Sequence, residues 1–200
     1  MIRPSRVVIV GSGFVGSTTA YSLMIQQVCT EIVLIDANKE RADGESLDLG
    51  HGLSFVRPMS IWAGTYRDCA DADVIIITAG ISQKPGQSRS DLTQANAAIV
   101  KGIVEEIARH TKDAIILVVT NPVDAMTYLA QKVSRFKPGR VLGSGTVLDS
   151  ARFRYYCGKQ FGINSRDIQG YILGEHGDTE VAYLSHATIC GERKLFTDRT

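Results

Sequence analysis

The sequence lacks a strong charge of either sign and any long apolar run. Its 200 residues carry a formal net charge of +1, which excludes the basic surface that binds nucleic acids or membrane surfaces. No stretch of about 18 apolar residues is present, so we predict no membrane-spanning segment. The first six residues, Met-Ile-Arg-Pro-Ser-Arg, are followed by only four apolar residues before Gly11, and this run is too short for the core of a signal peptide.

Closely spaced cysteines are also absent. Cys29, Cys69, Cys157 and Cys190 form no Cys-x-x-Cys pair and no zinc-ligand spacing. We therefore expect reduced thiols, no metal site and a cytoplasmic protein, because disulfides are rare in that compartment.

Short β-branched runs alternate with longer helical patterns up to about residue 144. Strands are predicted over 6–10, 31–36, 60–63, 73–78, 114–120 and 140–142, and helices over 14–28, 39–49, 92–110 and 123–134. Several of these strands are apolar at every position, which indicates a sheet that helices cover on both faces. The alternation predicts an α/β fold of the Rossmann type, with a doubly wound parallel sheet.

The alternation of strands and helices ends near residue 145. A helix is predicted over 149–161, followed by extended runs over 168–173 and 180–188. We therefore expect two domains, 1–144 and 145–200.

The first predicted strand runs into Gly11-Ser-Gly13-Phe-Val-Gly16, and a helical pattern follows. In dinucleotide-binding domains the three glycines allow a tight turn, approach of the backbone to a pyrophosphate, and close helix–strand packing. Asp36 closes the second strand, where an acid accepts a hydrogen bond from a ribose 2′-hydroxyl and disfavours the 2′-phosphate of NADP. A glycine-rich turn with a solvated aspartate is the alternative interpretation, and FAD-binding domains share the motif.

Polar residues follow three later strands of the predicted sheet. They are Gln83, Arg89, Asn121, Asp124, Asp149 and Arg152. Gln83 and Arg89 belong to a loop long enough to act as a lid. Farther along, Gly-Glu-His176-Gly-Asp places a histidine at a glycine-rich strand end. Each residue alone could be a solvated charge, a turn or a helix cap, but ligands bind at the carboxyl ends of such strands.

Taken together, these motifs resemble the lactate and malate dehydrogenase family of 2-hydroxy-acid dehydrogenases. The resemblance covers the whole chain, and the segments from Ala79 to Arg89 and from Gly143 to Arg154 resemble the bacterial lactate branch. It implies NAD as cofactor, a small 2-oxo or 2-hydroxy acid as substrate, and a place in glycolysis and fermentation. The domain over 145–200 would then be the first part of an α+β substrate domain.

The resemblance also implies a role for each polar residue. His176 would exchange a proton with the substrate oxygen, a task that suits histidine at neutral pH, and Asp149 would bind the other ring nitrogen. Arg152 would hold the substrate carboxylate through paired charge-assisted bonds. Arg89 would polarise the substrate carbonyl, and Asn121 would lie near the nicotinamide and the substrate oxygen.

Further positions are assigned by the same resemblance. Malate-type members carry arginine where this chain has Gln83, and the neutral amide suits a methyl group rather than a second substrate carboxylate. Asp124 joins the substrate-binding residues. The expected NAD-binding residues are Gly11, Gly13, Val15, Gly16, Asp36, Arg41, Tyr66, Gly80, Ile81 and Asn121.

Two departures from the family pattern matter. Members continue through further helices and assemble as tetramers, so we expect a homo-oligomer in a longer form and an incomplete substrate domain here. Members activated by fructose 1,6-bisphosphate pair an arginine with a histidine. Arg154 matches the arginine, but Gln169 stands at the histidine position. Because a neutral amide binds phosphate more weakly than an imidazolium, we expect weak or absent activation.

Two alternatives stay open. Within the enzyme class, the chain is a malate or other 2-hydroxy-acid dehydrogenase. From another class, it is a non-catalytic module that keeps the segment from Gly11 to Asp36 and binds NAD without turnover.

Overall fold

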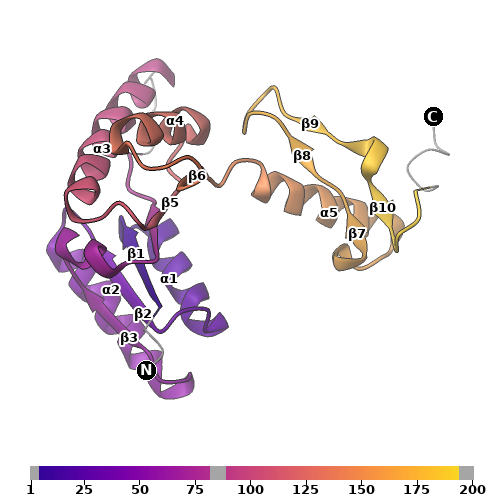
Figure 1. The fold of residues 1–200 in the computed structure, drawn as a ribbon. Helices are drawn as coiled ribbons and strands as arrows, with labels where there is room; N and C mark the ends of the chain where they lie inside the picture. The colour runs from indigo at the N-terminus through magenta and orange to yellow at the C-terminus, as the bar shows by residue number, and fades with distance from the viewer. Residues whose placement is uncertain (1–4, 82–88, 194–200) are drawn as a thin grey trace. The chain divides into compact units, whose positions relative to one another are not determined.

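The structure is a computed structural model that describes residues 5–81 and 89–193. The chain divides into two compact units, Met1–Gly143 and Ser144–Thr200. Figure 1 shows the helices and strands of both units. Among the helices described, none is long and apolar enough to cross a membrane.

The first unit is built on a six-stranded sheet. Its strands are β1 (Arg6–Val10), β2 (Glu31–Ile35), β3 (Ser60–Ala63), β4 (Val74–Ile77), β5 (Ile115–Val118) and β6 (Val141–Gly143). The order is β3-β2-β1-β4-β5-β6, and every neighbouring pair is parallel. The predicted Rossmann-type parallel sheet is therefore confirmed.

Helices connect these strands (Figure 1). They are α1 (Phe14–Gln26), α2 (Lys39–His51), α3 (Arg89–His110) and α4 (Val123–Ser134), with short 3-10 helices η1 (Gly52–Phe55) and η2 (Tyr66–Asp71). The predicted helix over 92–110 begins three residues earlier, at Arg89.

Both faces of the sheet are buried because its strands are apolar at successive positions. On β1, Val8 and Val10 belong to a core shared with α3 and α4. Val7 and Ile9 point the other way and belong to a core shared with α1 and α2. Each such side chain contributes about 1.5–3 kcal/mol when it is fully buried.

The central strand β1 pairs with β2 on one side and with β4 on the other. The chain therefore reverses its winding direction between β1 and β4. In open parallel sheets, ligands bind at the carboxyl edge beside this point. The glycine motif follows β1 at that edge.

The second unit contains one long helix and short antiparallel pairs. Its elements are α5 (Val147–Phe161), η3 (Ser165–Asp167), β7 (Ile168–Gln169), β8 (Ile172–Leu173), β9 (Val181–Ala182), η4 (Leu184–His186) and β10 (Thr188–Ile189). Strand β10 pairs with β7, and β8 pairs with β9.

The two extended runs predicted over 168–173 and 180–188 are therefore not continuous strands. In the first run, hydroxyls of α5 and of its N-cap residue Thr146 bond to the backbone of Ile172. Ser150 Oγ accepts from the Ile172 N–H at 2.9 Å, and Thr146 Oγ1 donates to the Ile172 carbonyl at 2.6 Å. Gly170 lies so close to Phe153 that an added Cβ would be 2.3 Å from the ring. These contacts with α5 separate β7 from β8. In the second run, η4 interrupts the extended chain.

Candidate active site

The glycine loop after β1 is packed at two of its glycines and open at the third. Gly11 has a φ of +107°, and a Cβ there would lie 2.5 Å from the Ala79 nitrogen. A Cβ on Gly16 would lie 1.8 Å from the Gly11 carbonyl oxygen. A Cβ on Gly13, in contrast, would meet nothing within 4 Å. The second glycine therefore borders open space, as a backbone that approaches a phosphate requires.

A cavity of about 470 Å³ lies at the carboxyl edge of the sheet. Six predicted cofactor residues line it: Gly11, Gly13, Asp36, Arg41, Tyr66 and Gly80. The other four do not. Gly16 is buried under the loop, Val15 is 55% exposed on α1, and Ile81 and Asn121 lie in the loops after β4 and β5.

The Asp36 carboxylate is held at this cavity by two backbone groups. Its Oδ2 accepts from the Ser12 N–H at 2.7 Å, and its Oδ1 accepts from the Asn38 N–H at 2.9 Å. Each carboxylate oxygen has two lone pairs, so capacity remains for a ribose hydroxyl. The geometry fits the predicted role of Asp36.

Tyr66 supplies a neutral phenol to the cavity wall. Burial, with smaller contributions from Cys69, Glu106 and Asp36, raises the pKa of Tyr66 to about 12. Its hydroxyl therefore stays protonated at neutral pH. It can donate a hydrogen bond without adding a charge beside Asp36.

A second cavity, of about 480 Å³, runs along the outer side of α1. Phe14 and Val15 border it, and its polar side chains are only hydroxyls and amides. Neither a titratable side chain nor any of the three motif glycines is among its lining residues. The cavity at the sheet edge is therefore the stronger candidate for a cofactor site.

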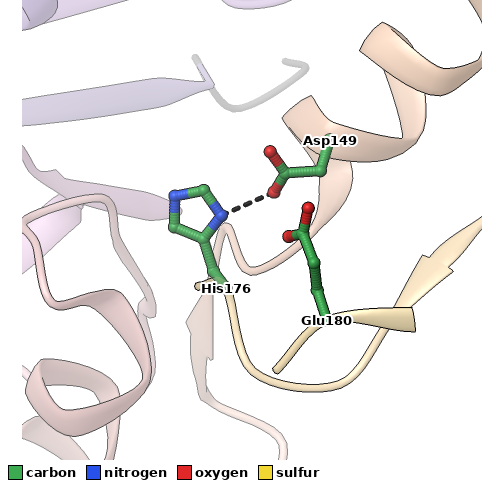
Figure 2. Close-up of side chains that lie close together, drawn as sticks. All are labelled: Asp149, His176 and Glu180. Carbon is green, nitrogen blue, oxygen red and sulfur yellow. Dashed lines mark hydrogen bonds and ion pairs between the residues drawn. The ribbon is translucent and has the colours of Figure 1, made fainter. Parts of the chain in front are cut away.

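In the second unit, the structure brings together three predicted catalytic residues, Asp149, Arg152 and His176. Asp149 lies in the first turn of α5 and is only 7% exposed. Its Oδ2 is 2.5 Å from His176 Nδ1, as Figure 2 shows. Its Oδ1 accepts from Arg152 Nη1 at 2.8 Å, one helical turn along α5.

These contacts determine the charge of Asp149. Burial raises its pKa, but the hydrogen bond and charge of His176, followed by those of Arg152, outweigh burial and lower the pKa below its usual value. The ionised carboxylate can only accept, so the His176 Nδ1 carries a proton. The other ring nitrogen points away from Asp149 (Figure 2) and is the one suited to acid–base work.

Glu180 lies beside this pair, and no motif had indicated it. Possible ligand atoms of Asp149, His176 and Glu180 lie within 4.8 Å of one another (Figure 2). Two ligands of a tetrahedral zinc ion would be about 3.4 Å apart, given bonds of about 2.1 Å. The 2.5 Å between His176 Nδ1 and Asp149 Oδ2 is too short for two ligands of one such ion and marks a short, direct hydrogen bond.

The remaining predicted residues lie outside these clusters. Gln83 and the side chain of Arg89 are outside the described residues. Asp124 is exposed in the first turn of α4. Arg154 donates from Nη1 to the Gly170 carbonyl at 3.1 Å, and Gln169 is exposed on β7.

Comparison with known proteins decides the family. The NAD-binding domain of the lactate/malate dehydrogenases matches residues 5–143. The α/β C-terminal domain of the same proteins matches residues 146–197. The chain belongs to the lactate/malate dehydrogenase family. The predicted resemblance is thus confirmed.

Several members of this family are closely similar to the chain. An L-lactate dehydrogenase of Acetivibrio thermocellus is 54% identical over 186 residues, which are 93% of this chain and 59% of that relative. One of Priestia megaterium is 53% identical over 189 residues, or 94% of this chain and 59% of that relative. The chain thus spans about three fifths of the length of these relatives.

Solved structures within the lactate/malate dehydrogenase family share the fold. The minor L-lactate dehydrogenase of Enterococcus mundtii, in its ligands-bound form, gives a TM-score of 0.93 at 47% identity, over 96% of this chain and 62% of that chain. Cryptosporidium parvum malate dehydrogenase gives 0.89 at 34% identity, over 94% of this chain and 60% of that chain. The chain therefore shares its fold with both an L-lactate and a malate dehydrogenase, and the fold alone does not distinguish the two.

Proposed function

We propose that the chain carries the cofactor site and the proton-transfer residues of an NAD-dependent L-lactate dehydrogenase. The observation that carries this proposal is the buried, ionised Asp149 bonded to His176 Nδ1, with Arg152 beside it. The L-lactate dehydrogenases at about 50% identity support the choice of reaction.

The cofactor site fits NAD. The open space at Gly13 can admit a pyrophosphate, whose charge the N-terminal N–H groups of α1 would stabilise. Asp36 would accept from a ribose hydroxyl and repel a 2′-phosphate. When bound, NADH supplies the hydride that goes to C2 of the substrate.

His176 would then give its proton to the oxygen on C2, and it would take that proton back in the reverse direction. Asp149 would stabilise the imidazolium and hold the ring in one orientation. Proton transfer of this kind contributes about 10²–10⁴ in rate. The carboxylate of pyruvate would bind Arg152, whose guanidinium has five N–H donors, and the bond to Asp149 uses only Nη1.

The other assignments extend the same proposal. Arg89 would polarise the substrate carbonyl, and Asn121 and Asp124 would border the substrate. Gln83 would favour the methyl group of pyruvate. The whole enzyme would work in the cytoplasm, in glycolysis and fermentation, as a homotetramer with little response to fructose 1,6-bisphosphate.

The test is NADH oxidation with pyruvate and with oxaloacetate, measured on this chain and on the full product of its gene. We expect turnover with pyruvate in the full gene product, and loss of that turnover in its His176→Asn variant. His51→Asn, an exposed histidine of α2, is the matched control and should keep the parent rate. NADH binding with no turnover in either form would favour the non-catalytic alternative.

A malate dehydrogenase is the second candidate, because the fold matches the Cryptosporidium parvum enzyme. The variant Gln83→Arg separates the two candidates. If Gln83 selects the substrate, the variant should gain activity with oxaloacetate and lose it with pyruvate. An unchanged ratio would show that another residue makes the selection.

A further inference from the structure

The geometry points to Asn96 as a positioning residue that joins the two loops at the carboxyl ends of β4 and β5 and thereby sets the wall of the cofactor cavity. The inference rests on the proposed function for its consequence, NADH binding. The linkage itself stands on hydrogen bonds within the first unit.

Asn96 lies on α3 with only 2% of its surface exposed. Its Oδ1 accepts from the Ile81 N–H at 2.8 Å, in the loop after β4. Its Nδ2 donates to the Asn121 carbonyl at 2.8 Å, in the loop after β5, and to the Ile81 carbonyl at 3.4 Å. The buried Asn96 amide thus bonds to both loops, and its oxygen and its nitrogen each have a hydrogen-bond partner.

Two threonines continue this linkage across the edge of the sheet. Thr120 Oγ1 donates to the Ala79 carbonyl at 2.7 Å, and Thr78 Oγ1 donates to the Gly11 carbonyl at 2.8 Å. The segments after β1, β4 and β5 are therefore joined by side-chain bonds in a row. Asn96 is the member of this row that comes from a helix.

The linkage reaches the cavity through Gly80. A Cβ on Gly80 would lie 2.8 Å from Thr120 Cγ2 and 3.2 Å from Asn96 Oδ1. Gly80 lines the cavity, so the amide and the threonine fix how far this backbone extends toward a bound cofactor. Loss of the amide would let the backbone of Gly80 and Ile81 move.

The choice of residue supports positioning rather than packing. The same helix places Val100, Val104 and Ile107 in the core, where a leucine at position 96 would bury more apolar area. Asparagine is also a poor residue for a helix interior. Within the described part of the chain, the hydrogen-bond partners of its amide are backbone groups of Ile81 and Asn121.

The test compares three variants of this chain. Asn96→Leu keeps a similar volume and loses every bond, whereas Asn96→Asp keeps the acceptor for the Ile81 N–H and loses the donor to Asn121. Gln94→Ala, an exposed residue two positions earlier on α3, is the matched control. Circular dichroism first establishes a temperature at which each variant is folded.

The first readout is amide hydrogen exchange without cofactor. In Asn96→Leu the Ile81 amide should exchange at least about tenfold faster, the change expected when a buried hydrogen bond is lost. In Asn96→Asp the Ile81 amide should stay protected. If Asn96→Leu does not fold, the NADH affinity of Asn96→Asp, which is the second readout, tests the positioning role.

That readout is NADH affinity by fluorescence. Both Asn96 variants should bind NADH at least about fivefold more weakly, and Gln94→Ala should bind like the parent. Acidification should restore affinity to Asn96→Asp, because a protonated carboxyl can again donate to the Asn121 carbonyl.

The outcomes separate the inference from the proposed function. Unchanged exchange at Ile81 in Asn96→Leu, or parent-like NADH affinity in both folded variants, would overturn the positioning role. A parent chain that binds no NADH would refute the proposed cofactor site. The exchange at Ile81 would then still decide whether Asn96 holds the loop.

Discussion

The glycine loop gives the sharpest prediction, because Gly13 and Gly16 belong to one motif but have opposite surroundings. Gly16→Ala would place a Cβ 1.8 Å from the Gly11 oxygen, so the backbone of α1 or of the loop must move. Overpacking of this kind costs about 1–3 kcal/mol or more. Gly13→Ala would meet no atom within 4 Å, and its φ of −70° is ordinary for alanine.

We therefore expect Gly13→Ala to change the free energy of unfolding by no more than about 1 kcal/mol, because the less flexible unfolded chain offsets the poorer cap that alanine provides at the N-cap of α1. The substitution should instead weaken NADH binding, because the new methyl group occupies the space proposed for the pyrophosphate. Loss of charge-assisted hydrogen bonds there is worth about 1.5–3 kcal/mol. That corresponds to about 10- to 100-fold weaker NADH binding.

The assay pairs urea unfolding with an NADH fluorescence titration on the same samples. Gly16→Ala should lower the free energy of unfolding, and Gly13→Ala should lower only the affinity for NADH. A Gly13→Ala variant with the parent's affinity would refute the assignment of the open space to the cofactor. A Gly16→Ala variant with the parent's stability would refute the packing argument.

Three further predictions concern the Asp149 carboxyl, the Ser12 hydroxyl and the response to fructose 1,6-bisphosphate. NMR titration should place the pKa of the Asp149 carboxyl below its usual range, because His176 and Arg152 stabilise the carboxylate, and Arg152→Ala should raise that pKa. Because the pKa is lower in the folded protein than in the unfolded chain, the stabilisation from this carboxylate is fully present above the unfolded pKa. It is lost as the pH falls through the folded pKa. Ser12→Ala should leave the free energy of unfolding unchanged or raise it by about 1–3 kcal/mol, because Ser12 Oγ is buried without a hydrogen-bond partner among the described residues; a clear loss of stability in urea unfolding would contradict this. Fructose 1,6-bisphosphate should leave the pyruvate KM of the full gene product unchanged, and a strong drop would show that Gln169 does not weaken the site.

Much of the first unit could be predicted from local patterns. Runs such as Val74–Ile77 are apolar at every position, so they predict strands buried on both faces, and the parallel sheet confirms it. The glycine motif was placed correctly because its spacing has a direct steric meaning. The family could also be predicted, because its motifs are short segments that are recognisable in the sequence.

The boundaries in the second unit were less predictable. The run 168–173 has strand composition throughout, but hydroxyls of α5 and of its N-cap residue bind the backbone of Ile172 and interrupt the strand. Those hydroxyls lie 22 and 26 residues away in the sequence. Local propensity contains no information about such partners.

The sequence by itself therefore determined the order of the elements, the glycine loop and the identity of the polar residues near the strand ends. Only the tertiary structure decided which of those residues meet. Asp149 and His176 are 27 residues apart and form one hydrogen-bonded pair, and Asn96 bonds to Asn121, 25 residues away. The reason is physical: a strand or a helix follows from the periodicity of neighbouring residues, whereas a hydrogen bond between distant residues depends on how the whole unit packs.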